Sequence, residues 1–213
     1  WRQAVLIVLG TAVCAAAANW PSIALTPVVT GVSAPVEVAS AGDGSGRLYV
    51  VQQSGQILIV SNGVVIGTLL DIGSRIIFGG EQGLLGVAFP SGFATGRHFY
   101  VSYTDPGWTS VVSRFWLLPG NPNLADTNSE EQLLRVHQPY ANQNGGQIGF
   151  SPSNNAYLYV GFGDGGSGND PSNLAQNTSQ LLGKMLRIGV EPPNGTTYAI
   201  PADNPFVGVG GFR

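Results

Sequence analysis

The sequence predicts an all-β protein built from repeated four-stranded units, which is the architecture of a β-propeller. Three observations support this fold class. The chain of 213 residues contains 31 glycines and 14 prolines, which interrupt helices and favour turns. Only 10% of its residues are charged, against about 25% in an average globular protein, as expected for strands buried on both faces. A strand–turn–strand pattern also recurs three times along the chain.

The three repeats share one order of elements: an apolar strand, a tight turn and a second strand that ends in an aromatic residue followed by valine. The paired strands are 36–39 with 47–50, 84–89 with 98–101, and 147–150 with 157–160. Tyr49, Tyr100 and Tyr159 occupy equivalent positions, and their spacing of about 50 to 60 residues suits a propeller blade. A β-sandwich is the alternative, because its strands also alternate with turns.

The N-terminal segment is predicted to be a secretory signal. Arg2 precedes a short apolar run that ends in small residues with Ala-x-Ala spacing near Ala18. The run of about 16 residues is shorter than the roughly 20 needed to span a bilayer. We therefore expect a signal peptide over residues 1–18, a linker or N-terminal strand over 19–31, and a secreted or periplasmic mature chain without a stable membrane span. A retained anchor, or a lipid on Cys14, is the alternative.

Charge and motif content exclude several classes of function. The formal net charge is −3, so no basic surface is expected to hold a phosphate backbone, and nucleic-acid binding is not predicted. The two histidines, His98 and His137, are not spaced as zinc ligands, and we expect them at the surface or in packing contacts. The chain has neither a Gly-x-Ser-x-Gly elbow nor a phosphate-binding loop. Serine hydrolase and nucleotide hydrolase functions are therefore not predicted.

Polar residues gather in three glycine-rich segments, 79–86, 142–147 and 161–170, where we predict a ligand site. The second and third segments flank the two strands of one hairpin, so they should lie within about 10 Å of each other. Asp164, Asn169 and Asp170 place oxygen ligands between glycines, as calcium-binding loops do. Ordinary turn chemistry of Gly, Asn and Asp is the alternative.

Five strings of the sequence resemble the glucose/sorbosone dehydrogenase family. They are GEQGLLGVAF (80–89), NQNGGQIGFSP (142–152), YLYVGFGDGGSGNDP (157–171), AQN…LLGKMLRI (175–188) and YAIPADNPF (198–206). The resemblance implies a secreted six-bladed β-propeller, of which residues 32–213 would form the N-terminal half with about three blades. Family members include aldose dehydrogenases that use pyrroloquinoline quinone (PQQ). The same propeller occurs in Hedgehog-interacting proteins, which bind a protein and perform no redox chemistry.

The resemblance also implies roles for single residues. In the enzymes, a histidine takes the proton of the sugar C1 hydroxyl as hydride passes to the quinone, an aspartate orients that histidine, and calcium polarises the quinone. The residues matched are Gln143 and Asp164 as catalytic, and Glu81, Gln143 and Asn144 as cofactor-binding. Asp164, Asn169 and Asp170 remain metal-binding candidates on the composition of their loop. The quinone-side calcium ligands of the family would lie in later blades.

Gln143 departs from the family pattern, because glutamine stands where the enzymes have the histidine base. An amide can hydrogen-bond a hydroxyl, but it has no useful basicity near pH 7. Either Asp164 or Glu81 has taken over the role of base, or the protein binds its ligand without turning it over.

The leading prediction is PQQ- and calcium-dependent oxidation of the C1 hydroxyl of aldoses to lactones, with a soluble electron acceptor, by the full-length protein. The 213-residue chain alone is expected to be inactive. A non-catalytic secreted propeller that binds a glycan or a protein is the main alternative, and a calcium-dependent lactonase-like propeller is a further one.

Overall fold

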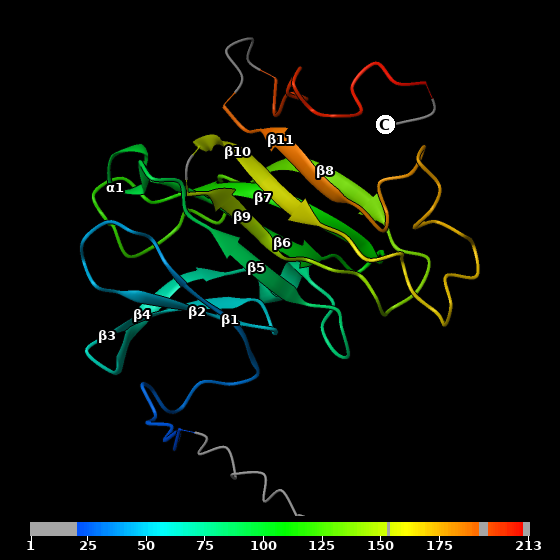
Figure 1. Ribbon diagram of the computed structural model, residues 1–213. Coiled ribbons are helices and arrows are strands. Elements are labelled where there is room, and N and C mark those ends of the chain that lie inside the picture. The colour runs from blue at the N-terminus through cyan, green and yellow to red at the C-terminus, as the bar shows by residue number, and fades with distance from the viewer. Residues whose placement is uncertain (1–20, 153, 192–195, 211–213) are drawn as a thin grey trace, which may run out of the picture.

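The computed structural model describes residues 21–152, 154–191 and 196–210, which form three antiparallel sheets that follow one another in chain order (Figure 1). The first contains β1 (Pro35–Ser40), β2 (Leu48–Gln52), β3 (Gln56–Ser61) and β4 (Val64–Asp71); the second contains β5 (Leu84–Ala88), β6 (His98–Thr104), β7 (Thr109–Trp116) and β8 (Glu131–His137); the third contains β9 (Ile148–Ser151), β10 (Asn154–Gly161) and β11 (Met185–Gly189). Within the described residues, helix is limited to α1 (Phe93–Gly96) and one 3₁₀ turn (Gly73–Arg75).

Each sheet is a meander, in which every strand pairs with its neighbour in sequence. The first strand of each sheet, β1, β5 or β9, therefore lies at an edge, and β5 packs beside both β1 and β9. The three repeats of the sequence thus become three blades, with Tyr49, Tyr100 and Tyr159 all on second strands. The predicted fold class, an all-β propeller with three blades present, is confirmed. The third sheet, however, has three strands within the described residues, where four were expected.

The two larger clusters of the hydrophobic core lie between the faces of neighbouring blades. Phe99 and Val101 of β6 face the first blade, where they join Tyr49 and Ile57 in one cluster. The alternate residue Tyr100 joins the cluster shared with the third blade, because successive side chains of a strand point to opposite faces. The second blade is therefore buried on both faces, which explains the low content of charged residues.

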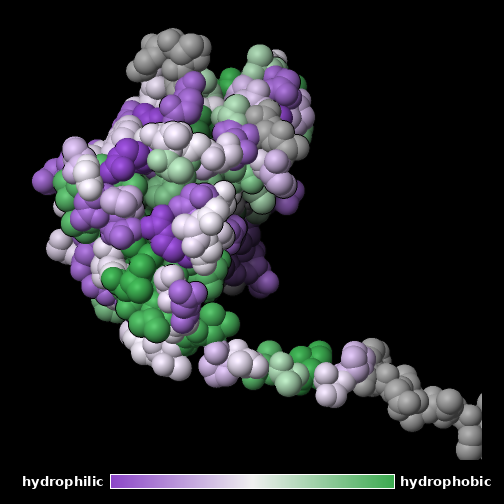
Figure 2. Space-filling view, turned by 90° about the vertical axis from the view of Figure 1, so that its left-hand side faces the viewer, coloured by the Kyte–Doolittle hydropathy of each residue, from purple (hydrophilic) through white to green (hydrophobic). Residues whose placement is uncertain are grey.

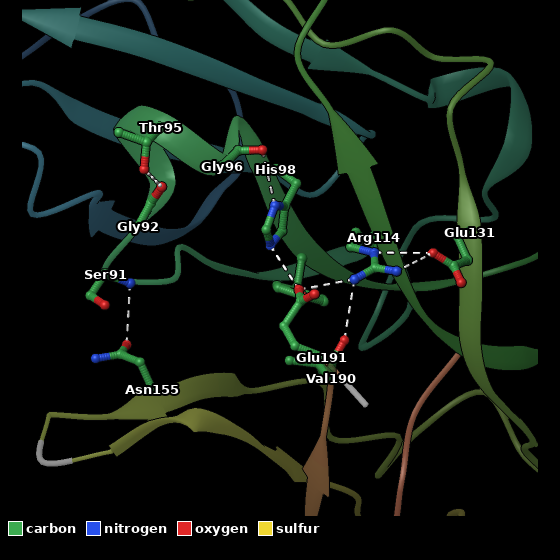
Figure 3. A network of polar contacts seen from close by, with 11 residues as sticks. Ser91, Gly92, Thr95, Gly96, His98, Arg114, Glu131, Asn155, Val190 and Glu191 are labelled. Carbon is green, nitrogen blue, oxygen red and sulfur yellow. Dashed lines mark hydrogen bonds and ion pairs between the residues drawn. The ribbon is translucent and has the colours of Figure 1, made fainter. Parts of the chain in front are cut away.

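A polar network also joins the second and third blades (Figure 3). Oε1 of Glu191, which follows β11, accepts hydrogen bonds from the Tyr100 hydroxyl at 2.8 Å and from Nη1 of Arg114 at 2.9 Å. It also lies 3.0 Å from Nε2 of His98. Arg114 pairs at the same time with Glu131 of β8. The ring of His98 also packs against the rings of Tyr100 and Trp116, which is the packing role that the sequence predicted.

The outermost strand of the first blade, β4, was not predicted. Its first residues, Val64, Val65 and Ile66, are consecutive and exposed, so they lack the alternation that identifies a half-buried strand. Figure 2 shows apolar side chains gathered on the surface in the region of the first blade.

Residues 21–34 contain no strand, and the predicted signal peptide lies outside the described residues. The described part of the chain includes no helix of the length and apolar character that crossing a membrane requires.

Candidate functional site

Glu81 lies at the tip of a tight turn that precedes β5. Gly79 and Gln82 close this turn with two backbone hydrogen bonds of 3.1 and 3.0 Å. The side chain of Gln53 holds the turn from the first blade, because its Nε2 donates to the carbonyl oxygens of Gly80 at 2.9 Å and Gln82 at 2.8 Å. The turn therefore presents an exposed carboxylate at a fixed place beside the first strand of the second blade.

The two glycine-rich segments of the third blade are joined by backbone hydrogen bonds. Gly146 N donates to Gly161 O at 3.0 Å, and Gly161 N donates to the carbonyl oxygen of Gln147 at 2.9 Å. Glycine is required at this junction: a Cβ on Gly163 would lie 1.9 Å from Gln143 O, and one on Gly145 would lie 2.5 Å from Gly161 O. The prediction that segments 142–147 and 161–170 lie together is confirmed.

Gln143 stands at the centre of this junction and contacts both predicted carboxylates. Its backbone adopts the left-handed conformation, with φ of +54°, and its backbone N–H donates to Oε2 of Glu81. In the amide orientation that satisfies the hydrogen bonding, Nε2 donates to Oδ1 of Asp164 at 2.6 Å and to Ser167 O at 2.9 Å. The structure thus brings Glu81, Gln143 and Asp164 into one cluster.

The orientation of the Gln143 amide decides what the cluster can bind. A carboxylate only accepts hydrogen bonds, so Asp164 takes the NH₂ end of the amide, and Oε1 is the end that can accept a hydrogen bond. Asp164 is fixed in turn by the backbone N–H of Gly166, at 3.0 Å. Gln143 is exposed and Asp164 is half-buried. The cluster therefore offers acceptor atoms to ligands that carry hydroxyl donors.

Neither histidine is placed to act as a base in this cluster. The site lies next to the start of β5, which pairs with the end of β6, whereas His98 is the first residue of β6. His137 is exposed at the end of β8, the outermost strand of the second blade. Within the described ranges, neither imidazole hydrogen-bonds to Glu81, Gln143 or Asp164.

Asn144 is turned away from the exposed cluster. Its side chain is fully buried, and its Nδ2 donates to the carbonyl oxygens of Tyr140 at 3.0 Å and Asn142 at 3.2 Å. These bonds fix the curvature of the loop that carries Gln143. The placement does not support the cofactor contact that the sequence predicted for Asn144.

The residues predicted to bind calcium have other partners. Both carboxylate oxygens of Asp170 accept backbone N–H groups, from Leu174 at 2.7 Å and from Ala175 at 2.9 Å, so this side chain caps the following turn. Asp164 is engaged with Gln143, and Asn169 is exposed. No group of three or more His, Cys, Asp or Glu side chains in the described part of the chain is placed to hold a metal ion. The calcium role of these three residues therefore remains a prediction without structural support.

We expect Asp170→Asn to lower the stability of the full-length protein by about 1–3 kcal/mol, because one half-buried N–H loses its acceptor. If Asp170 is a turn cap, the loss should be equal with excess calcium and with EDTA. Thermal unfolding under both conditions measures this. A loss seen only with calcium would instead restore Asp170 as a metal ligand.

The cluster does not by itself fit PQQ, the cofactor that the resemblance implies. PQQ carries carboxylate groups, which Glu81 and Asp164 would repel. Within the described residues, the hydrogen bonds of Glu81, Gln143 and Asp164 involve neither Lys nor Arg. The exposed acceptors fit a neutral ligand with hydroxyl groups better than an anionic quinone.

Sequence reasoning missed the residues that hold the cluster from neighbouring blades. Gln53 belongs to no recognisable motif, and only the structure shows that it holds the Glu81 turn. Gln147 lies inside a segment that was singled out, but its hydrogen bond to Glu37 of the first blade was not foreseen. The signal available was its position at the end of the glycine-rich stretch that precedes β9.

Three meandering sheets carry a polar cluster on the loops before β5, before β9 and after β10. They define the class of protein: a β-propeller with a candidate small-molecule site at one end of its blades. The family model "Glucose / Sorbosone dehydrogenase" matches residues 32–213. The chain belongs to this family.

The curated relatives are not described as dehydrogenases, although they are similar to this chain in sequence. The human Hedgehog-interacting protein is 30% identical over 84% of this chain and 27% of its own length. The HIPL1 protein of Arabidopsis thaliana is 28% identical over 77% of this chain and 32% of its own length. The chain thus spans about a third or less of the curated relatives it matches.

Solved structures of dehydrogenases are also similar. An oxidoreductase of Thermus thermophilus, described as a glucose dehydrogenase, matches with a TM-score of 0.69 and 26% identity, over 88% of this chain and 52% of its own. The PQQ-bound aldose sugar dehydrogenase of Streptomyces coelicolor matches with a TM-score of 0.67 and 25% identity, over 85% of this chain and 50% of its own. The chain covers about half of each.

Proposed function

We propose that the full-length protein binds an aldose at the cluster of Glu81, Gln143 and Asp164 and oxidises its C1 hydroxyl with PQQ, passing the electrons to a soluble acceptor. The observation that carries this proposal is the hydrogen bond of Gln143 to Asp164. These residues stand where the family resemblance implies the base and the aspartate that orients it. The PQQ-bound dehydrogenase among the structural neighbours supports the cofactor.

The residues of this chain would divide the work as follows. Oε1 of Gln143 accepts the hydrogen of a sugar hydroxyl, Asp164 holds the amide in that orientation, and Glu81 fixes the Gln143 backbone. PQQ, when bound, would supply the hydride acceptor, and we expect its contacts to come chiefly from other parts of the full-length protein. We place the protein outside the cytoplasm, in accordance with the predicted signal sequence.

The proton of the sugar hydroxyl has no strong acceptor in this arrangement, because an amide is not a base near pH 7. A carboxylate must take the proton if oxidation proceeds. Asp164 is the first candidate, since its Oδ1 bonds the same amide that would receive the sugar.

The hydrogen bond of Gln143 to Asp164 also favours a second function. In this function, the protein is a secreted propeller that binds a glycan or a protein without turnover. Free amide and carboxylate acceptors suffice for binding hydroxyl groups, and Hedgehog-interacting proteins belong to the matched relatives.

One pair of measurements on the full-length protein separates these functions. We expect PQQ to bind with calcium present, and we expect aldose-dependent reduction of an added dye. Aldose binding without any PQQ binding would contradict the dehydrogenase function and support the non-catalytic binding function. Binding of neither would refute the sugar site.

A further inference from the structure

Glu37 is a half-buried carboxylate that the cluster described above does not include. It lies on β1, the first strand of the first blade, and its Oε2 accepts the backbone N–H of Val87 at 2.7 Å. Its Oε1 accepts Nε2 of Gln147 at 3.1 Å. Val87 belongs to β5, and Gln147 directly precedes β9. One side chain therefore connects the first strands of all three blades.

The partners of Glu37 are uncharged. Burial raises the pKa of Glu37, and the hydrogen bonds from Val87 and Gln147 offset only part of this effect. Within the described residues no cation pairs with it. A desolvated carboxylate without a cation costs stability. The two hydrogen bonds from neutral groups do not by themselves explain why a carboxylate occupies this position.

The consequence of Glu37 lies in the orientation of the Gln147 amide. Because a carboxylate only accepts, it takes the NH₂ end of that amide, and the second hydrogen of Nε2 is directed to Ile148 O at 3.2 Å. Both donor positions of Gln147 are therefore used. Its Oε1 is left as a free acceptor on an exposed side chain.

Gln143 and Gln147 thus have the same arrangement at the two ends of one loop. In each, a carboxylate binds the NH₂ end of the amide and leaves the carbonyl oxygen as the acceptor end: Asp164 does so for Gln143 and Glu37 for Gln147. Gln147 follows Gln143 by four positions, so their Cα atoms lie at most about 14 Å apart. A ligand seated on the loop can meet both.

We propose that Gln147, oriented by Glu37, is a second ligand-binding residue, and that the two amide oxygens select neutral hydroxyl-rich ligands and reject anionic ones such as sugar phosphates. This rests on the proposed function, because it adds a subsite to the same sugar site. Free acceptors pair with hydroxyl donors. A phosphate group brings acceptors and negative charge toward Glu37, Glu81 and Asp164, which repel it.

The variant Glu37→Gln tests the orientation directly. Its amide oxygen keeps the Val87 N–H, so its NH₂ group faces Gln147 and binds the carbonyl end of that amide. The Gln147 amide then turns and presents its NH₂ group to the ligand. The variant removes one negative charge and exchanges an acceptor for a donor, without removing a side chain. A purely structural Glu37 would not change which sugar is preferred.

The experiment is calorimetric titration of the full-length protein with D-glucose and D-glucose 6-phosphate. We expect the wild type to bind glucose at least about 10-fold more tightly than the phosphate. Gln147→Ala should weaken glucose binding about 3- to 10-fold, the effect of one neutral hydrogen bond. Glu37→Gln should lower the ratio of glucose affinity to glucose 6-phosphate affinity by about 10-fold. Gln132→Ala, an exposed glutamine on the outer strand β8, is the matched control and should bind as the wild type does.

Gln147→Asn keeps an amide but withdraws it by one methylene, so it should also weaken glucose binding. This variant tests the subsite even if the alanine variant folds poorly. If Gln143→Ala abolishes glucose binding while the Gln147 and Glu37 variants match the wild type for both sugars, the sugar site stands and the second subsite is wrong. If no form binds either sugar, the proposed function is wrong and the subsite falls with it.

Discussion

Replacing Gln143 with histidine in the full-length protein is expected to raise the rate of aldose oxidation by about 10² or more, because a positioned general base contributes about 10²- to 10⁴-fold. Asp164 already accepts a hydrogen bond from the Gln143 side chain, so an imidazole at this position has a carboxylate available to orient it. Steady-state rates with PQQ and calcium added measure the effect.

Gln143→Asn is the control, since it keeps an amide and adds no base, and it should show no gain. Equal rates for the wild type and the histidine variant would mean that another group already removes the proton. In that case Asp164→Asn should lower the wild-type rate strongly. No activity in either form, together with no PQQ binding, would contradict the dehydrogenase proposal.

Gly163→Ala is expected to cause the largest loss of stability in the site, about 3 kcal/mol or more, and to abolish ligand binding. The added Cβ would lie 1.9 Å from the carbonyl oxygen of Gln143. This oxygen belongs to the backbone of a loop that is hydrogen-bonded to its neighbour, so moving it aside costs stability. Shifting that carbonyl also displaces the side chain that contacts Asp164.

Gly168→Ala is the matched control for this substitution. Gly168 lies in the same loop, and a Cβ there would meet no atom within 4 Å, so its effect should stay within about 0.5 kcal/mol. Denaturant unfolding of the two full-length variants gives the comparison. Similar stability for both would show that the two loops are not packed as described.

The fold was predictable because its signals are local and repeated. Tyr49, Tyr100 and Tyr159 recur with the period of a blade, and the alternation on β6 follows from burial between two neighbours. The strand β4 was missed because its exposed apolar residues carry no such alternation. Signals of this kind specify blades, but they do not specify which loops meet.

The site was predictable where two segments flank one hairpin, as 142–147 and 161–170 do. It was not predictable where a side chain reaches across blades. Gln53 and Glu37 belong to the first blade, and their contacts with the second and third depend on the tertiary arrangement. The composition of Asp164, Asn169 and Asp170 indicated calcium, but turn capping uses the same residue types, and the contacts of Asp170 are those of a turn cap.

The most direct test of the central claim is a crystal structure of the full-length protein with a bound aldose. We expect a sugar hydroxyl within hydrogen-bond distance of Oε1 of Gln143, with the Gln143 amide still donating to Asp164. A sugar bound elsewhere, with Gln143 contacting only protein, would contradict it.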